Sequence, residues 1–153
     1  MKQELEQKLL EKYPRVFGRG KYRSQESRVP YAYPCVGDGW YDIVDTVCAL
    51  IERRHQELER LNTLLVNENE FDDYPEDDNI EWQPVIQAVQ IKEKFGGLRF
   101  YTTSTNDYIR GVIDAAEALS LRTCETCGSP GKPRNDGWIK TLCDVHAKAE
   151  GKK

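Results

Sequence analysis

The longest helical pattern of apolar residues begins at a Gly-Asp-Gly-Trp segment, residues 37–40. One helix face is marked by residues at i, i+3 and i+4 spacing: Trp40, Ile43, Val44, Val47, Leu50, Ile51, Leu58 and Leu61. Asp38 precedes this face where an N-cap carboxylate would accept free backbone amides. We therefore predict a long helix capped by Asp38, with Cys48 as a small core residue beside the apolar face. A lone histidine, His55, is predicted to be a surface residue or a satisfied hydrogen-bond partner.

Two shorter helices are predicted on either side of it. Residues 2–13 place Leu5, Leu9 and Tyr13 on one stripe, and Pro14 ends the pattern. Residues 106–121 form the other helix, with Ser104 or Thr105 as its cap. Its inward residues are predicted to be Ile109, Val112, Ile113, Ala116 and Leu119.

Between these helices, residues 84–103 alternate apolar and polar positions around Gly96-Gly97, which predicts a β-hairpin. With the two glycines as the turn, Phe95 faces Leu98, Lys94 faces Arg99, and Lys92 faces Tyr101. The predicted core face holds Val89, Ile91, Phe95, Leu98 and Phe100. The predicted outer face holds Gln90, Lys92, Lys94, Arg99, Tyr101 and Thr103.

The C-terminal part of the chain contains a metal-ligand pattern. Two pairs with two-residue gaps, Cys124/Cys127 and Cys143/His146, are separated by 15 residues. This spacing lets both members of each pair reach one tetrahedral Zn²⁺. Because four protein ligands leave no open position for water, we expect a structural zinc. Gly128 follows the first pair, where a metal knuckle needs a residue free to adopt positive φ.

The segment between the two pairs predicts a second hairpin. Residues 131–134 and 138–142 have the pattern of strands around an Asn-Asp-Gly turn, and a helix follows Cys143. Knuckle, hairpin and helix in this order predict a treble-clef zinc module, with Trp138 packed beside its hairpin. The predicted fold class is therefore α+β: helices packed on a β-hairpin, with a C-terminal treble-clef-like zinc module.

Two segments interrupt the predicted domains, which are an α+β domain (1–121) and a zinc-binding module (122–153). Residues 14–36 have no period and are expected to be loop-rich or disordered. Residues 67–81 hold eight acidic residues and no basic one, and we interpret them as an acidic linker. The whole chain has a net charge of −4, so the residues outside this acidic linker together carry +4.

The composition also predicts where in the cell the protein is located. Hydrophobic residues make up 39% and charged residues 31% of the 153 residues. No apolar run approaches the roughly 18 residues of a membrane span, and the N-terminus lacks a signal-peptide core. We therefore expect a cytoplasmic protein without a membrane partner, in which Cys35 and Cys48 stay reduced outside the metal cluster.

The outer face of the hairpin is the predicted binding site. Like charges placed opposite each other on a sheet repel, so Lys94 facing Arg99 requires an anion nearby. Lys92 adds a third cation, and Tyr101 adds a ring for stacking, with Trp40 or Tyr41 at the edge. Glu93 or the acidic segment 68–81 could supply the anion from within the chain. An external nucleotide, nucleic acid or protein carboxylate remains the alternative.

Enzyme function is disfavoured by the residue types. A histidine-metal nuclease needs a catalytic histidine on the hairpin, but the chain has only His55 and the predicted ligand His146. Residues 38, 42 and 45 are aspartates, which we interpret as a cap and solvent-facing helix residues. No phosphate-loop, dinucleotide-binding or nucleophile-elbow motif is present. No catalytic residue is predicted.

Several strings together resemble a family of small uncharacterised proteins of bacteriophage and prophage genomes. They are GDGWYD from Gly37, KEKFGGLRFY from Lys92, and CETCG with GWIKTLCDVH from Cys124 and Gly137. No activity is known for the family. The resemblance implies an accessory protein acting in a bacterial cytoplasm, and suggests inhibition of a host defence system by binding.

Three functions follow from these patterns. The first is a non-enzymatic protein that binds an anionic ligand or a host protein on the hairpin face. The second is a nucleic-acid-binding zinc protein whose positive surface includes Lys132, Arg134, Lys140 and Lys148. The third is a nuclease or phosphodiesterase. The sequence also predicts that Trp40 is buried between the long helix and the hairpin.

Overall fold

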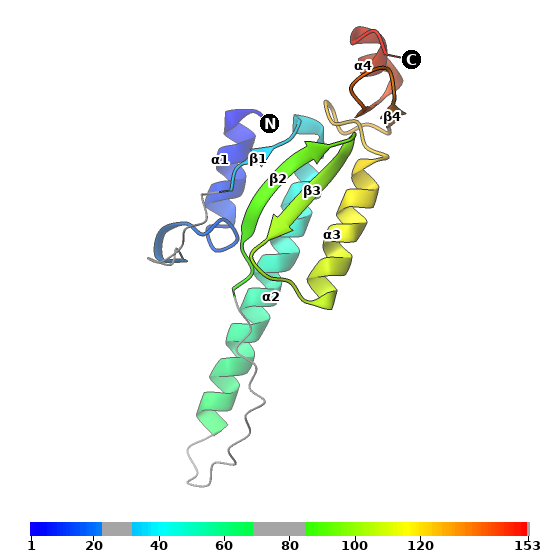
Figure 1. The fold of residues 1–153 in the computed structure, drawn as a ribbon. Coiled ribbons are helices and arrows are strands. Elements are labelled where there is room, and N and C mark those ends of the chain that lie inside the picture. Colours follow the sequence, from blue (N-terminus) through cyan, green and yellow to red (C-terminus); the bar gives the residue numbers. More distant parts are fainter. Residues whose placement is uncertain (23–31, 69–84, 153) are drawn as a thin grey trace.

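The computed structural model describes residues 1–22, 32–68 and 85–152. The segments outside it hold nine residues of the predicted loop-rich region and most of the predicted acidic linker. Along the chain, the elements are α1 (Gln3–Lys12), the 3-10 turn η1 (Gly20–Tyr22), β1 (Pro34–Cys35), the 3-10 turn η2 (Asp38–Trp40), α2 (Tyr41–Glu68), β2 (Ala88–Lys94), β3 (Gly97–Thr102), α3 (Asp107–Ser120), β4 (Lys132–Arg134), β5 (Lys140–Leu142) and α4 (Asp144–Ala149) (Figure 1). The mixed α+β class is confirmed.

The first sheet has the strand order β1-β2-β3, with β1 parallel and β3 antiparallel to β2. Its hairpin turn is Phe95-Gly96, not the predicted Gly96-Gly97. Both turn residues have positive φ, 53° and 78°, as the central positions of a type I′ turn require. The Glu93 carboxylate accepts a hydrogen bond from Gly96 N at 2.6 Å and holds the turn. Gly97 instead begins β3, opposite Lys94.

This turn changes the predicted pairs. Lys92 faces Arg99, and Gln90 faces Tyr101. The predicted pairing of Lys94 with Arg99, and of Lys92 with Tyr101, was therefore wrong. The observed register of β2 against β3 differs from the predicted one by two residues, so each side chain stays on the face of the sheet predicted for it. Two residues are exceptions. Phe95 lies in the turn and is 69% exposed, so its predicted place in the core was wrong. A register shift between Ala88 and Gln90 gives Ala88 the core position predicted for Val89, which is only half-buried.

A short parallel strand that was not predicted widens the sheet. Side chains of residues 32–36 alternate: Ala32, Pro34 and Val36 are buried, whereas Tyr33 and Cys35 are exposed. The exposed pair thus shares the outer face with the polar residues of β2 and β3. Pro34 lies beside Ile91, which is fully buried on the inner face.

The core lies on the inner face of the sheet, and the helices α1, α2 and α3 all contribute buried residues to it. In Figure 1, α2 passes behind the sheet and α3 lies along the β3 side. The core includes Val44, Val47, Ile51, Leu98, Phe100 and Ile109. Leu61 and Leu119 were predicted to face inward but are 48% and 52% exposed. The C-terminal part of α2 continues beyond the sheet in Figure 1.

The predicted caps were wrong. Asp38 lies inside the 3-10 turn, and its carboxylate accepts Lys2 N at 2.6 Å instead of a helix amide. Helix α3 is capped by Asn106, whose side-chain oxygen accepts Ile109 N at 2.9 Å. Among the described helices, none has the length and apolar character required to cross a membrane.

Two residues of α2 are buried core groups, and only one ring nitrogen of His55 is hydrogen-bonded within the described residues. Cys48 is buried as predicted, and this burial raises the pKa of its thiol far above the ordinary value. His55 is only 5% exposed, and its Nε2 accepts a hydrogen bond from Ile86 N at 3.0 Å. Burial, assisted by the charge of Arg15, lowers the pKa of His55 to about 4. The imidazole is therefore neutral at physiological pH.

Candidate metal centre and outer sheet face

The four predicted ligand side chains come together. The ligand atoms of Cys124, Cys127, Cys143 and His146 all lie within 4.8 Å of one another. His146 Nδ1 is 3.6 Å from Cys124 Sγ and 3.2 Å from Cys143 Sγ, and the sulfurs of Cys127 and Cys143 are 3.9 Å apart. In a tetrahedral zinc site, bond lengths of about 2.3 and 2.0–2.1 Å imply separations of about 3.8 Å (S···S) and 3.6 Å (S···N). The cluster could therefore hold a metal ion.

Local backbone structure positions each ligand. In the knuckle, residues 124–128, Gly128 N donates to Cys124 O at 2.8 Å, and Gly128 has a φ of 77°. The antiparallel strands β4 and β5 then return the chain to Cys143, which precedes α4. His146 lies in the first turn of α4. The predicted order of knuckle, hairpin and helix is thus present around the cluster.

Two features of the metal module favour a bound cation: the thiolate form of Cys127 and the small size of the core. Hydrogen bonds from the side chain and backbone of Ser129 lower the pKa of Cys127 to about 6, which favours the thiolate. Few apolar groups stabilise the metal module, residues 122–152: its buried cluster consists of Cys124, Leu142 and Ala147. So small a core calls for a covalent or metal cross-link.

The knuckle packs against the Gly-Asp-Gly-Trp segment, residues 37–40. Gly39 N donates to Glu125 O at 2.7 Å, and the indole of Trp40 donates to Thr123 O at 2.8 Å. A Cβ at Gly39 would lie 2.2 Å from Cys124 O. One at Gly37 would lie 2.2 Å from Glu125 O. The two glycines are therefore needed because backbone meets backbone at this interface.

The tip of the β2–β3 hairpin makes the second contact with the metal module. Thr141 Oγ1 donates to Gly96 O at 2.6 Å, and Thr141 O accepts Glu125 N at 2.9 Å. Burial at this junction raises the pKa of Glu125, opposed by a hydrogen bond from Gly37 N and assisted by Glu93. A polar cleft of about 430 Å³ remains beside it, with Cys35, Asp38 and Lys140 among its lining residues.

The outer face of the sheet carries the predicted binding residues Lys92, Lys94, Arg99 and Tyr101. Arg99 has an internal partner: its guanidinium lies 3.2 Å from the Glu117 carboxylate and donates to Leu98 O at 2.6 Å. Glu117 was not among the predicted partners. The Nζ atoms of the two lysines lie 5.7 Å from the Tyr101 ring centroid (Lys92) and 5.4 Å from the Phe95 ring centroid (Lys94). Neither lysine forms a salt bridge with a described residue.

No protein family, curated protein or solved structure matches this chain.

The remaining predicted aromatic residues lie elsewhere. Trp40 is fully buried, as predicted, and Tyr41 packs half-buried against the same core. Trp40 marks the junction with the metal module, because its indole donates to Thr123 O. The packing predicted for Trp138 was wrong, because its ring is 70% exposed and its indole donates to Glu93 at 3.3 Å.

The sequence pattern does not indicate the exposed position of Tyr33 on the outer face of the sheet or the docking role of Gly37 and Gly39. The exposed position of Tyr33 depends on the two-residue strand β1 (Pro34–Cys35) that follows it, and a strand this short shows no recognisable alternation in the sequence. The close approach at Gly39 depends on a partner segment 85 or more positions away in the chain. Within the described residues, no metal-ligand cluster other than Cys124/Cys127/Cys143/His146 is found.

Proposed function

We propose that the protein is a non-enzymatic, zinc-stabilised binding protein that takes an anionic ligand on the outer face of its β1–β2–β3 sheet. One observation carries this proposal: Lys92 stands directly opposite Arg99, and Lys94 follows on the same face. Like charges in this position repel each other. Glu117 offsets the charge of Arg99 alone, so an anion at the two lysines would relieve the remaining repulsion.

The zinc assignment rests on the donor set. Three thiolates and one imidazole are soft or borderline ligands that suit Zn²⁺ and disfavour the oxygen-seeking Mg²⁺ and Ca²⁺. The chain order of knuckle, hairpin and helix supports a treble-clef module. Its role is to fix the hairpin tip through the contact of Thr141 with Gly96, so that the outer face of the sheet is held in one conformation.

Charge pairing favours the sheet over the metal module as the anion site. Two of the basic residues predicted to contact nucleic acid from the module have partners within it. Arg134 is buried and pairs with Asp144, and Lys140 lies 2.9 Å from Glu150. Following the resemblance to phage and prophage proteins, the ligand would belong to a bacterial host, and its capture would serve to inhibit a defence system.

Binding of inorganic tripolyphosphate, measured by isothermal titration calorimetry on the zinc-loaded protein, tests the proposal. We expect Lys92→Ala/Lys94→Ala to weaken binding by at least about tenfold, and the affinity to fall as salt rises. The control is Lys8→Ala, which removes an exposed lysine on α1. If wild type and the double variant bind equally, or if the Lys8 variant loses as much affinity, the proposed site is wrong.

A further inference from the structure

Two exposed tyrosines stand in one row across the outer face of the sheet. Gln90 on β2 is paired with Tyr101 on β3. On the other side, Pro34 pairs with Ile91, so continuing that register by one residue places Tyr33 beside Gln90. The alternating burial of residues 32–36 puts the Tyr33 side chain on the outer face. Tyr33 and Tyr101 are 45% and 43% exposed, and they flank the exposed Gln90.

The spacing of this row fits one planar ring. Tyr33 and Tyr101 are two strands apart, which separates their backbones by about 9.5 Å at the usual inter-strand distance. A flat ring stacked on both tyrosines needs a gap of about 7 Å, at about 3.4 Å per stacked face. Side chains leaning toward the middle of the sheet can provide this gap. At its floor, the amide of Gln90 offers both hydrogen-bond donors and an acceptor to the edge of a ring.

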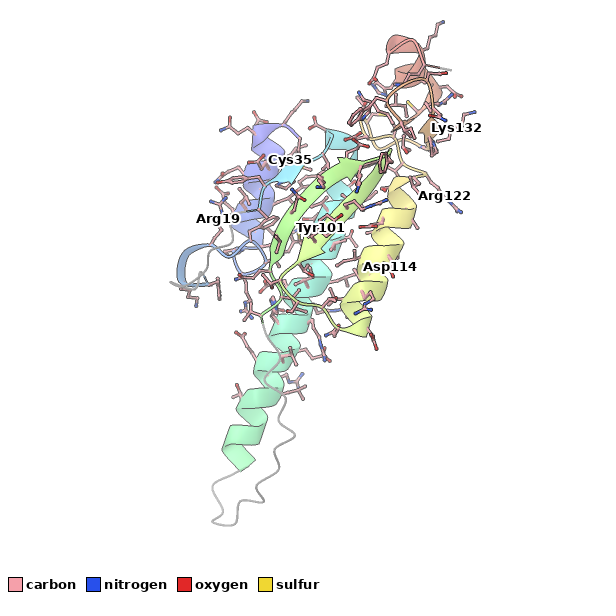
Figure 2. The ribbon with its side chains drawn as sticks, in the orientation of Figure 1. Arg19, Cys35, Tyr101, Asp114, Arg122 and Lys132 are labelled. Atoms are coloured by element: carbon pink, nitrogen blue, oxygen red, sulfur yellow. The ribbon has the colours of Figure 1, made fainter. Side chains whose placement is uncertain are left out.

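Cations accompany both rings. The Arg19 guanidinium lies 5.1 Å from the Tyr33 ring centroid, and Lys92 Nζ lies 5.7 Å from that of Tyr101. Figure 2 shows Tyr101 and Cys35 over the sheet, with Arg19 beside β1. The neighbouring row of the sheet contains Cys35, Lys92 and Arg99. A planar ring entering the gap would displace the Lys92 ammonium from Tyr101, and a phosphate attached to that ring would give the ammonium a new partner.

We propose that this row is a nucleobase site: an unpaired base stacks between Tyr33 and Tyr101 over Gln90, and its phosphate contacts Lys92 and Lys94. This inference rests on the proposed function, because it places the phosphate at the anion position proposed there, Lys92 and Lys94. Exposed aromatic rings interleaved with cations on a sheet face suit unpaired bases, since every base has a stacking face and a nearby phosphate. Such a base can come from a free nucleotide or from a single strand of nucleic acid.

Calorimetric titration of the zinc-loaded protein tests the base site. The probes are the four ribonucleoside monophosphates, ribose 5-phosphate, and single-stranded DNA and RNA of mixed sequence and about 12 nucleotides. At least one base-bearing probe should bind at least about tenfold more tightly than ribose 5-phosphate. Tyr33→Ala and Tyr101→Ala should each weaken that binding by about 5- to 150-fold. They should leave the tripolyphosphate affinity unchanged. Tyr108→Ala is the control, because Tyr108 is 46% exposed on α3, outside this sheet.

The probes separate the two sources and the two proposals. Tight binding of a monophosphate assigns the site to a free nucleotide, whereas binding of the oligonucleotides alone assigns it to a strand. If every base-bearing probe binds no better than ribose 5-phosphate while tripolyphosphate still binds at the lysines, the base site is overturned and the anion site stands. Equal losses in the Tyr101 and Tyr108 variants would overturn the base site too. If tripolyphosphate also fails to bind, both proposals fall.

Discussion

Replacing Gly39 with alanine should separate the metal module from the rest of the protein without touching a metal ligand. The added methyl carbon would lie 2.2 Å from Cys124 O, 2.3 Å from Gly128 N and 2.6 Å from Cys127 N. All three are backbone atoms of the knuckle, so no side chain can rotate out of the way. To reach even 3.0 Å from Cys124 O, the knuckle must move by about 0.8 Å.

The energetic cost follows from the contacts at this interface. That movement strains three hydrogen bonds: Gly39 N to Glu125 O (2.7 Å), Gly37 N to the Glu125 carboxylate (3.0 Å), and Trp40 Nε1 to Thr123 O (2.8 Å). At about 0.5–1.5 kcal/mol each, the loss of these hydrogen bonds amounts to about 3 kcal/mol. The overpacking itself adds about 1–3 kcal/mol. We expect Gly39→Ala to lower the free energy of unfolding by about 4–6 kcal/mol, a large share of the stability of a small domain.

Urea unfolding followed by circular dichroism measures this loss, and metal analysis of the same samples should still find zinc. The matched control is Gly111→Ala in α3, because a Cβ there meets no atom within 4 Å. Alanine in that helix interior should stabilise the protein by about 0.5–1 kcal/mol. If Gly39→Ala unfolds within about 0.5 kcal/mol of wild type, the knuckle does not rest on Gly39 as described.

Three further predictions concern the sheet, the buried histidine and the metal. Arg99→Ala should cost about 1–2 kcal/mol in urea unfolding, because it removes the ion-pair partner of the partly buried Glu117 and leaves that carboxylate the hydrogen bond from Phe100 N; Lys94→Ala should stay within about 0.5 kcal/mol of wild type, and equal costs would contradict the internal ion pair. The pKa of His55 is about 4 in the folded protein, below the ordinary 6.5. Between pH 4 and pH 6.5 the imidazole is therefore protonated in the unfolded chain and neutral in the folded protein, so protonation favours unfolding. Stability is thus full above about pH 6.5 and should fall by about 2 kcal/mol between about pH 7 and pH 5 through this group. His55→Gln, which keeps an acceptor for Ile86 N, should show a smaller fall than wild type, and an identical pH dependence would refute the assignment. Purified protein should contain about one equivalent of zinc, and chelation should unfold at least the metal module; an unchanged melting curve after complete chelation would exclude a structural metal.

The elements that local pattern specifies were predictable from the sequence. The ligand set emerged from the two-residue gaps of Cys124/Cys127 and Cys143/His146, because such spacing has few structural uses other than metal binding. Trp40 and Cys48 were placed in the core by helical periodicity. Face membership on β2 and β3 also survived the register error, since a two-residue shift preserves the alternation of side chains.

The parts that depend on tertiary contacts could not be predicted. Local turn preferences favour Gly96-Gly97, yet the chain turns at Phe95 because Glu93 and Thr141 hold Gly96 from both sides. The partner of Arg99 comes from α3, and sequence gave no register between that helix and β3. Likewise, the packing of Gly39 on the knuckle becomes visible only when distant segments meet.

The most direct test of the anion site is to locate it by NMR. Two-dimensional ¹H–¹⁵N spectra of the zinc-loaded protein would be recorded while inorganic tripolyphosphate is added. We predict that amide shifts concentrate at residues 90–94 and 99–101, with little change at residues 111–116 of α3. The same titration of Lys92→Ala/Lys94→Ala should lose these shifts. If tripolyphosphate instead perturbs the metal module or α3 and leaves β2 and β3 unchanged, the outer face of the sheet is not the binding site.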